Sequence, residues 1–473
     1  MEIPTAPLAK LGLALQKGEP FSLTEEERAD TERAFLEIER MRLTGKYPKH
    51  KMKKQLMQSL HKMLGLALQL DDQNKNAPDS VEAEENLPLI KLVPNTNRGG
   101  EVDTSAYSFA ATENIRRLHE SLDAYAVTPL VSLKNFAAEK NIRALYVKNE
   151  STRFGLKAFK GLGGVWAIYC VISRELGLNN PTLDEIFAHR DKLAEMTFIT
   201  TTDGNHGKGI SWAAGLFGCK SFVFMPKGTV EVRAQAIRDA GSAIVEITDM
   251  DYDNCVKFTA RLAAEKHWHL IQDTSWSGYE EIPAQIMRGY STLAYEALAQ
   301  MNYQRPTHIF LQAGVGSMAG AIAAVFAEVF KDNPPRITIV EPTEVACFYE
   351  TMRIGDGLIH SATGNGQTMM AGLNCATPCE LAWKILRRYS SDTVTIPDDI
   401  AADAMIQLAN PFGDDEKIIS GESGCAGFAL ANAALDNPEL RRALELDEQS
   451  IIFVINTEGA TDPDNYQCVM RNA

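Results

Sequence analysis

The stretch STRFGLKAFKGLGG, residues 151–164, places a single lysine, Lys160, between Phe159 and a run of glycines. It directly follows ALYVKNE, residues 144–150, whose apolar and β-branched residues predict a strand. The small residues after Lys160 predict the start of a helix. A lysine at such a junction is either a solvated ammonium or a buried, nucleophilic amine, and the surrounding sequence has to distinguish the two.

The sequence on both sides of this stretch predicts an α/β protein. Beyond residue 88, short apolar segments alternate with Ala-rich helical stretches. The segments predicted as strands are ALYVK, MTFITT, SFVFM, AIVEI, HIFLQA, RITIVE and SIIFVIN. Apolar strands that alternate with helices indicate parallel sheets covered on both faces, and such sheets bind ligands beyond the carboxyl ends of their strands. The strand-to-helix loops are therefore the candidate sites of chemistry.

The composition narrows the class of protein. A chain of 473 residues predicts two or three domains, and 45% hydrophobic with 23% charged residues is usual for a protein with a sizeable core. A net charge of −15 argues against nucleic-acid binding, and no apolar run approaches the ~18 residues that cross a membrane. The eight scattered cysteines form neither a disulfide framework nor a zinc site, so we expect a cytoplasmic protein without a metal.

Residues 1–88 predict a helical N-terminal extension followed by an acidic linker. Thr24 lies three residues before Glu27, which is the spacing of a capping box at a helix start. A second amphipathic helix is predicted over residues 51–70, with Met52, Leu56, Leu60 and Leu64 on one stripe, and its apolar face is expected to pack on the protein itself or on an oligomer partner. The polar, acidic residues 71–88 read as the linker.

The first loop of interest is ITTTDGNHGKGISWAAG, residues 199–215, where a strand ends and a helix starts. Gly204 and Gly207 allow a tight turn, and free N–H groups at a helix N-terminus suit a substrate carboxylate. Asp203, at the turn itself, either caps the helix or acts as a base. We expect Thr202 and Asp203 to contact the substrate.

The second loop is IFLQAGVGSMAGAIAAVF, residues 309–326, which joins a strand to an Ala-rich helix. Its glycines can cradle a phosphate with backbone amides at a helix N-terminus. The spacing of Gly314 and Gly316 also fits the dinucleotide-binding fingerprint, with Glu341 at the end of the following strand. From the residues alone, an NAD-dependent dehydrogenase therefore stays open.

Two further loops carry polar side chains beside predicted strand ends. Thr457, Glu458 and Thr461 follow the last strand and suit contact with a ring nitrogen, or simply form a polar turn. Asp273 and Tyr279 belong to the aromatic and acidic loop QDTSWSGY, which either closes over a small cationic ligand or packs ordinarily.

Together these loops resemble the fold type II pyridoxal-phosphate enzymes, the tryptophan synthase β-like family. KAFKGLGG resembles the segment that carries the Schiff-base lysine, AGVGSMAG takes the place of the phosphate loop, and TTDGNHG resembles the SGNHG loop with Asp203 at the serine-like position. TPL, residues 128–130, resembles the early Thr-Pro-Leu of that family. The resemblance implies two α/β domains with mainly parallel sheets: a large cofactor-binding domain from 89–158 and 250–473, and a small domain from 159–249.

One subfamily, the diaminopropionate ammonia-lyases, is similar over roughly residues 120–470. The segments that resemble it, in its order, are YVKNESTRFGLKAFKGLGG, TTDGNHGKGISWAA, MPKGT, QDTSWSGYEEIPAQIMRGY, LQAGVGSMAGA, MMAGLNC, SGESGCAGF and NTEGATDP. The resemblance implies a homodimeric lyase of amino-acid catabolism. It would convert L- and D-2,3-diaminopropionate to pyruvate and two ammonia by α,β-elimination through an aminoacrylate. A serine/threonine-type dehydratase on the same cofactor and a non-catalytic interaction protein also stay open.

The same resemblance implies roles for individual residues. Lys160 would form the internal aldimine with pyridoxal 5′-phosphate, and burial is expected to lower its pKa. Phe159 and Asn205 would flank the cofactor ring, and Thr457 is the favoured partner of its nitrogen, with Glu458 and Thr461 as neighbours. The phosphate would be held by Gly314, Val315, Gly316, Ser317 and Met318.

The resemblance also implies two bases, because the two enantiomers present their Cα protons to opposite faces of the cofactor. Lys160 would serve the L-isomer and Asp203 the D-isomer. Asp273 and Tyr279 are expected to contact the substrate together with Thr202.

Overall fold

Two compact units make up the chain, Met1–Leu87 and Pro88–Ala473. The computed structural model describes residues 90–241 and 243–471 and, in the N-terminal unit, Lys10, Leu23, Thr24, residues 26–31, Arg33 and Ala34. The predicted capping box is confirmed, since Thr24 N–H donates to Glu27 Oε2 at 2.9 Å and Glu27 N–H to Thr24 Oγ1 at 3.2 Å. The helix predicted over residues 51–70 and the linker at 71–88 lie outside the described residues.

A seven-stranded sheet forms the larger half of the main unit, Pro88–Ala473. In spatial order its strands are β1 (Lys91–Pro94), β10 (Ser390–Ile396), β9 (Arg336–Pro342), β8 (His308–Gln312), β11 (Ile451–Asn456), β3 (Ala144–Asn149) and β2 (Leu130–Ser132). The five interior strands are parallel, and only the edge strands β1 and β2 pair antiparallel. The carboxyl ends of β3, β8 and β11 therefore open toward the same edge of the sheet.

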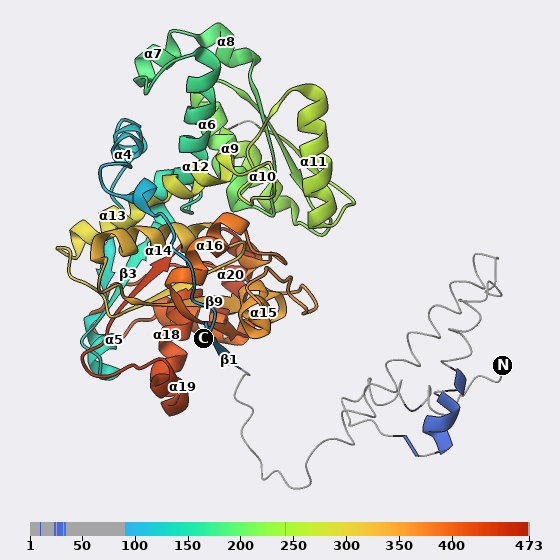
Figure 1. Ribbon diagram of the computed structural model, residues 1–473, viewed down its shortest axis with the longest axis vertical. Coiled ribbons are helices and arrows are strands. Elements are labelled where there is room, and N and C mark those ends of the chain that lie inside the picture. Colours follow the sequence, from blue (N-terminus) through green and yellow to red (C-terminus); the bar gives the residue numbers. More distant parts are fainter. Residues whose placement is uncertain are drawn as a thin grey trace. The chain divides into compact units, whose positions relative to one another are not determined.

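A four-stranded parallel sheet forms the smaller half. Its order is β6 (Ile244–Ile247), β5 (Lys220–Met225), β4 (Thr197–Thr201) and β7 (His269–Leu270). Because β7 pairs with β4, the smaller sheet continues beyond residue 249, where the sequence places the domain boundary. Figure 1 shows the two sheets in separate lobes of the main unit, with helices around each.

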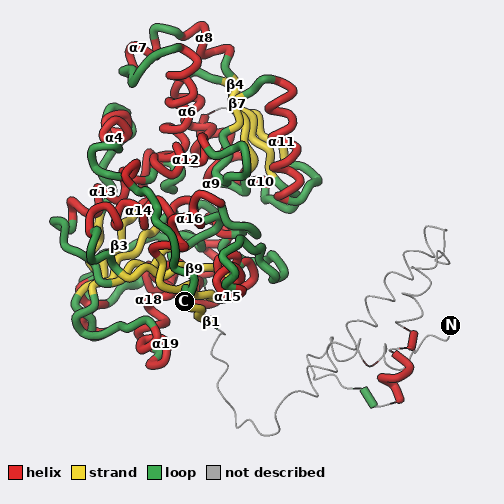
Figure 2. Tube along the Cα trace, in the orientation of Figure 1, coloured by secondary structure: helices red, strands yellow, loops and turns green. Residues whose placement is uncertain are grey.

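Helices cover both sheets, as Figure 2 shows by the helices on either side of the strands. The helices are α4 (Glu113–Glu120), α5 (Lys134–Glu139), α6 (Gly161–Leu176), α7 (Leu183–Phe187), α8 (Arg190–Glu195), α9 (Asn205–Phe217), α10 (Glu231–Gly241), α11 (Tyr252–Lys266), α12 (Glu281–Gly289), α13 (Ser291–Gln300), α14 (Ser317–Phe330), α15 (Cys347–Ile354), α16 (Glu380–Tyr389), α17 (Asp398–Ala409), α18 (Ala426–Asp436), α19 (Pro438–Ala443) and α20 (Pro463–Met470). In the described part of the chain, 3₁₀ segments also lie between these elements: η1 (Ser105–Tyr107), η2 (Glu150–Gly155), η3 (Thr343–Val345) and η4 (Ala371–Leu373).

The glycines after Lys160 let α6 pack closely on α9 and α12. A Cβ on Gly163 would lie 2.7 Å from the carbonyl oxygen of Ile286 on α12. A Cβ on Gly209 of α9 would lie 3.1 Å from the backbone nitrogen of Gly161. Since both approaches are too close for a side chain, the small residues set the position of the helix that begins at Lys160.

All seven predicted strands are confirmed as β3, β4, β5, β6, β8, β9 and β11, and the α/β fold class is confirmed with them. The sequence did not predict β10, SSDTVTI, because most of its side chains are polar. Two of these polar side chains are nevertheless buried and paired: Asp392 pairs with Arg336 at 2.6 Å, and the Thr393 hydroxyl donates to Glu341 at 3.1 Å. The short strands β1, β2 and β7 were not predicted either.

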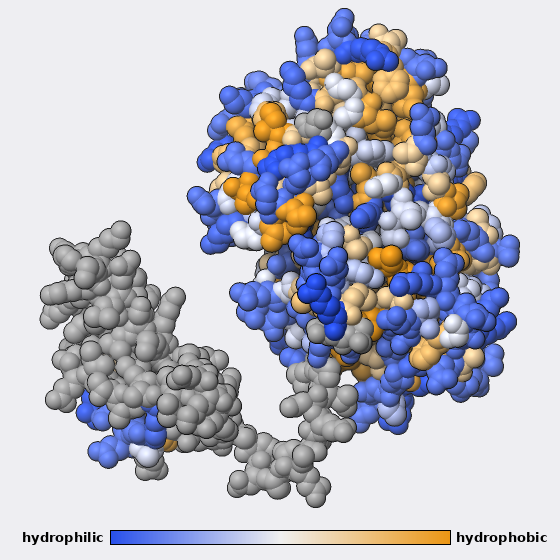
Figure 3. Space-filling model, turned by 180° about the vertical axis from the view of Figure 1, so that it is seen from behind, coloured by the Kyte–Doolittle hydropathy of each residue, from blue (hydrophilic) through white to orange (hydrophobic). Residues whose placement is uncertain are grey.

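The surface of the main unit is mixed. On the face opposite to that of Figure 1, apolar patches lie among hydrophilic residues (Figure 3). Exposed large apolar side chains include Phe109, Val127, Ile244 and Leu358. Within the part of the chain that the structure describes, no helix combines the length and the apolar character needed to cross a membrane.

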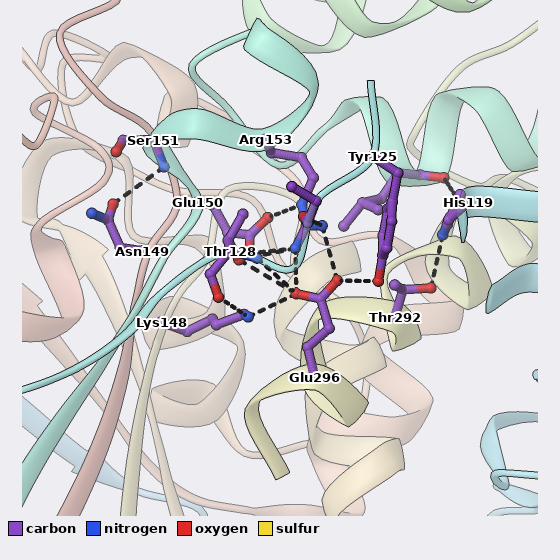
Figure 4. A network of polar contacts seen from close by, with 12 residues as sticks. His119, Tyr125, Thr128, Lys148, Asn149, Glu150, Ser151, Arg153, Thr292 and Glu296 are labelled. Atoms are coloured by element: carbon purple, nitrogen blue, oxygen red, sulfur yellow. Dashed lines mark hydrogen bonds and ion pairs between the residues drawn. The ribbon is translucent and has the colours of Figure 1, made fainter. Parts of the chain in front are cut away.

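A buried ionic network anchors the segment that leads to Lys160 (Figure 4). Lys148, at the end of β3, and Arg153, in η2, each lie 2.7 Å from Glu296 Oε2 of α13. Arg153 also contacts Glu150 at 2.8 Å, and the Thr128 hydroxyl donates to Glu150 at 2.6 Å. Two cations thus balance two carboxylates, and every charge in this cluster has a partner of opposite sign.

Candidate active site

One cavity brings together the loops that follow β4, β8 and β11 and the start of α6. Among the residues predicted from the sequence, its wall contains Phe159, Lys160, Thr202, Asp203, Asn205, Asp273, Gly314, Val315, Gly316, Ser317, Met318 and Thr457. Residues that sequence reasoning did not assign to the site, or assigned only as neighbours, complete the wall: Thr201, His206, Tyr252, Gln312, Ala313, Gly372, Leu373, Cys375, Ser423 and Glu458. Of these, Ser423 lies in the SGESGCAGF segment, so its motif signalled a place near the site.

Lys160 ends in an ion pair, which corrects the expectation that its pKa is lowered. Its Nζ lies 2.6 Å from Asp273 Oδ2. Burial by itself lowers the pKa of the Lys160 ammonium, but the Asp273 carboxylate outweighs burial and the pKa lies above its ordinary value. In the cofactor-free protein the lysine is therefore an ammonium with 18% of its side chain exposed, and it must lose a proton before it reacts.

Asp273 and His206 form the surroundings of this ammonium. Burial alone would raise the pKa of Asp273, yet the charges of His206, once it is protonated at low pH, and of Lys160 lower it to about 2. His206 Nε2 lies 2.8 Å from the carbonyl oxygen of Ile271, so this nitrogen carries the ring proton. Its Nδ1 faces Asp273 Oδ2 at 3.7 Å, and burial lowers the pKa of His206. Neutral His206 therefore packs against the ion pair without adding a charge.

Asp203 does not cap α9, although its position made capping one of the two expectations. The cap is supplied by Thr202, whose Oγ1 accepts hydrogen bonds from the N–H groups of Gly204 at 2.9 Å and Gly207 at 3.2 Å. The Asp203 carboxylate is left to face the cavity. Burial raises its pKa to about 6, while the charges of Arg233 and Lys160 limit the rise. A carboxylate of this kind is ionised at neutral pH and basic enough to take a proton.

The glycine loop before α14 has the shape of an anion cradle. Gly316 is the N-cap of α14 at φ +89°, and a Cβ there would collide with the ring of Phe348. A Cβ on Gly314 would lie 3.1 Å from Cys375 Sγ. The backbone therefore runs at the cavity wall with no room for side chains, and the first N–H groups of α14 offer donors to an anion. This geometry fits the phosphate of pyridoxal phosphate.

Hydrogen bonds hold the other walls of the cavity in place. The Ser317 hydroxyl donates to the backbone oxygen of Asp273 at 2.7 Å, which ties the glycine loop to the partner of Lys160. Gln312 Nε2 donates to Thr457 Oγ1 at 3.3 Å and to the carbonyl oxygen of Ile455 at 2.9 Å. The Thr457 hydroxyl can then donate its own proton toward the cavity.

Asn205 and Glu458 join the two lobes across the cavity. Asn205 Nδ2 donates a short hydrogen bond to Glu458 Oε2. Glu458 also accepts from the Ser423 N–H at 3.1 Å and from the Thr461 hydroxyl at 3.3 Å. The carboxylate of Glu458 is thus engaged by three donors, while Thr457 keeps a hydroxyl for the ring nitrogen.

Tyr279 is the predicted site residue that does not line the cavity. Its hydroxyl donates to the carbonyl oxygen of Leu270 and accepts from the N–H of Gln272, both at 2.9 Å, and its ring stacks on Trp276. These bonds brace the chain immediately before Asp273, so Tyr279 supports the site from behind.

Glu341 has no part in the glycine loop, although its position fitted a dinucleotide fingerprint. Its carboxylate is fully buried and accepts hydrogen bonds from the N–H groups of Phe348 at 2.8 Å and Tyr349 at 2.7 Å. It therefore caps the start of α15. A ribose could not reach it, so the structural basis for a dehydrogenase is lacking.

Cysteines and carboxylates do not assemble a metal site within the residues that the structure describes. All eight cysteines are free thiols, and Cys375 lies in the cavity wall.

The family of pyridoxal-phosphate dependent enzymes matches residues 122–458. A diaminopropionate ammonia-lyase from Salmonella typhimurium is 40% identical over 404 residues, which cover 81% of this chain and 98% of that protein. The chain belongs to the pyridoxal-phosphate dependent enzymes and, within them, to the diaminopropionate ammonia-lyases. It is therefore a lyase that uses pyridoxal phosphate, and neither a dehydrogenase nor a non-catalytic scaffold.

Solved structures of this family agree with the fold. A holo diaminopropionate ammonia lyase from Escherichia coli superposes with a TM-score of 0.76 at 38% identity, covering 81% of this chain and 97% of that one. The Escherichia coli enzyme in complex with an aminoacrylate-PLP azomethine reaction intermediate gives 0.75 at 38% identity, covering 82% of this chain and 98% of that one. As a diaminopropionate ammonia-lyase, the chain has the fold type II architecture that the sequence predicted.

Proposed function

We propose that the chain converts both enantiomers of 2,3-diaminopropionate to pyruvate and two ammonia by α,β-elimination. The observation that supports this most is the cavity itself, in which an amine, Lys160, and a carboxylate, Asp203, lie with a glycine cradle for phosphate. The choice of substrate is supported by the 40% identity with a diaminopropionate ammonia-lyase, of which this chain covers 98%.

Different residues of the cavity would bind different parts of the cofactor. Pyridoxal phosphate, when bound, supplies an electron sink that stabilises negative charge at the substrate Cα. Lys160 would hold it covalently, and the backbone from Gly314 to Met318, Val315 and Ser317 included, would bind its phosphate. Phe159 and Asn205 would flank the ring, and the Thr457 hydroxyl would donate to or accept from the ring nitrogen.

Two groups would move the proton at Cα. Lys160, as a neutral amine, would take the proton from the L-isomer. Asp203, ionised at neutral pH, would take it from the D-isomer. Asp273 would attract the β-ammonium group of the substrate, while N–H groups at the start of α9, beside Thr202, would receive its carboxylate.

The activity test uses the full chain loaded with pyridoxal phosphate. Four compounds are offered one at a time: L-2,3-diaminopropionate, D-2,3-diaminopropionate, serine and threonine. We expect pyruvate from both diaminopropionates, with two ammonia released per pyruvate, and much slower turnover of serine and threonine. Faster turnover of serine or threonine would make the chain a dehydratase instead. No 2-oxo acid from any of the four would overturn the proposal.

Two variants test the residue roles. Lys160→Ala should abolish the visible absorbance of the bound cofactor and turnover of both isomers. Asp203→Asn should lower kcat/KM for the D-isomer by about 10²- to 10⁴-fold, the usual contribution of a general base, and spare the L-isomer. Equal loss for both isomers would contradict the two-base assignment, so the L-isomer serves as the internal control.

We also propose a cytoplasmic homodimer that works in amino-acid catabolism. The scattered cysteine spacing supports a reducing compartment. Exposed apolar side chains such as Phe109 and Val127 supply surface that a second copy can cover. Light scattering of the purified chain would test the dimer, and the mass of a monomer would contradict it.

A further inference from the structure

A second pocket opens off the catalytic cavity on the side of Asp203. It shares Asp203, Asn205 and Glu458 with the cavity and adds two cations, Lys208 of α9 and Arg233 of α10. We call it the side pocket. The proposed chemistry leaves both cations without a role.

Arg233 of α10 packs on the turn that carries Asp203, although it is 30 residues away in the sequence. Its Cδ is 3.8 Å from the point where a Cβ on Gly204 would be, so the arginine stem covers the turn that carries Asp203. Arg233 lines the side pocket, and its side chain has no ion pair or hydrogen bond within the described part of the chain. Arg238, on the same helix, differs in this respect because it pairs with Glu231 at 2.5 Å.

We propose that Arg233 is a positioning residue for Asp203: its charge, held at the side pocket, keeps the carboxylate ionised and so sets the pH range in which the D-isomer is turned over. The inference rests on the proposed function, and on Asp203 as the base for that isomer.

The charges that face Asp203 come from several elements. Among them, Arg233 on α10 is the strongest influence that lowers the pKa of Asp203, followed by Lys160 at the start of α6, while Asp273 raises it. Lys208 on α9 and Glu458 after β11 share the side pocket and bear opposite charges. Lys160 is already paired with Asp273 and would hold the cofactor. Arg233 shares the side pocket with Glu458, and its charge also limits the rise in the pKa of Glu422 that burial causes.

The experiment compares three variants of the loaded full-length enzyme: Arg233→Gln, which removes the charge, Arg233→Lys, which retains it, and Arg238→Gln as the matched control on the same helix. The acidic limb of the kcat/KM profile for D-2,3-diaminopropionate reports the pKa of the base in the free enzyme. Arg233→Gln should move this limb upward by about 0.5 to 1 pH unit, because a nearby positive charge is lost. The other two variants should leave it in place, and the profile for the L-isomer should not move in any of them.

A second readout does not depend on turnover. In cofactor-free protein, the infrared carboxyl band of Asp203 is isolated by subtracting the spectrum of Asp203→Asn, and its titration midpoint gives the pKa directly. This midpoint should rise in Arg233→Gln and stay unchanged in Arg238→Gln.

Failure of this inference can be told apart from failure of the proposed function. If Asp203→Asn is selective for the D-isomer but Arg233→Gln moves neither the limb nor the infrared midpoint, the inference is wrong and the two-base scheme stands. If Arg233→Gln lowers both isomers equally at every pH, Arg233 is structural and the inference is also wrong. If neither isomer yields pyruvate with the unmodified chain, the proposed function fails first.

Discussion

Replacing Arg153 by methionine would test the buried ionic network that carries the Lys160 segment. The Arg153 guanidinium contacts both carboxylates of the network, the Thr128 hydroxyl at 3.0 Å and the carbonyl oxygen of Ala126 at 3.1 Å. Methionine fills much of the same volume without the charge. Glu150 and Glu296 then face a single cation, Lys148, in a region that water does not reach.

The expected loss in free energy of unfolding follows from the response of the folded variant that costs least free energy, which is to protonate one carboxyl group. A glutamate with an ordinary pKa of 4.5 costs about 3.4 kcal/mol to protonate at pH 7, at about 1.36 kcal/mol per pH unit. Lost hydrogen bonds add to this, so we expect a loss of about 3 to 5 kcal/mol at pH 7, as for other broken buried pairs.

The pH dependence has a definite sign. In the variant, the folded-state pKa of one carboxyl group is raised above its unfolded value, so the penalty is absent below pH 4.5 and grows as the pH rises. At pH 5 protonation costs only about 0.7 kcal/mol. The difference in free energy of unfolding between the two proteins should therefore be markedly smaller at pH 5 than at pH 7.

Urea titration followed by tryptophan fluorescence measures this difference at both pH values. A double variant that also carries Glu150→Gln restores the charge balance, so the pH-dependent part of the loss should vanish. Arg174→Met is the surface control. Arg174 lies 3.2 Å from Glu281, and both side chains are more than half exposed, so the substitution should lower the free energy of unfolding by no more than about 1 kcal/mol. A loss in Arg153→Met that is equal at pH 5 and pH 7 would refute the reasoning.

Two further substitutions probe the cavity. Gly316→Ala should weaken pyridoxal-phosphate binding by about tenfold or more in a spectroscopic titration, because the backbone at φ +89° and the Phe348 ring both resist a Cβ. Gly100→Ala, at φ +84° with no atom within 4 Å of the new Cβ, is the control for backbone strain alone, and an equal loss of affinity there would contradict the cradle. Asp273→Asn should lower the pKa of Lys160, because burial is then no longer offset by the carboxylate 2.6 Å away. Cofactor-free Asp273→Asn should take up pyridoxal phosphate faster than the unmodified chain below pH 8, and an unchanged or slower rate would contradict the ion-pair assignment.

The strands that the sequence predicts are those in which burial shows as an unbroken apolar run. SIIFVIN and HIFLQA lie side by side in the sheet interior, with Val454 opposite Val147 and Phe310. β10 was missed because Asp392 and Thr393 are buried by pairing with Arg336 and Glu341, which come from the neighbouring strand. A polar strand in a sheet interior shows in a sequence only when its partners are already known.

The loops of the site could be predicted because each combines a strand end, small residues and one reactive side chain. The fold then brings loops from both sheets together, which places Lys160, Asp203 and Thr457 in one cavity although they are far apart in sequence. Tyr279 was drawn into the site by its nearness to Asp273 in the chain. Its hydroxyl instead hydrogen-bonds to the backbone of Leu270 and Gln272, on either side of Ile271. This contact depends on the course of the chain after the short strand β7, which the sequence did not predict.

The protonation state of Lys160 could not be predicted from the sequence. Burial could be inferred from the residues around the lysine, and burial alone lowers the pKa of an amine. The opposing influence comes from Asp273, which is 113 residues away and reaches Nζ only because β7 joins the smaller sheet beside β4. The same argument applies to Asp203, whose turn lies beneath Arg233 from a different helix. In this fold the sequence places the reactive groups on their loops, whereas their protonation states depend on charges that the packing of the two sheets and their helices brings within a few ångströms.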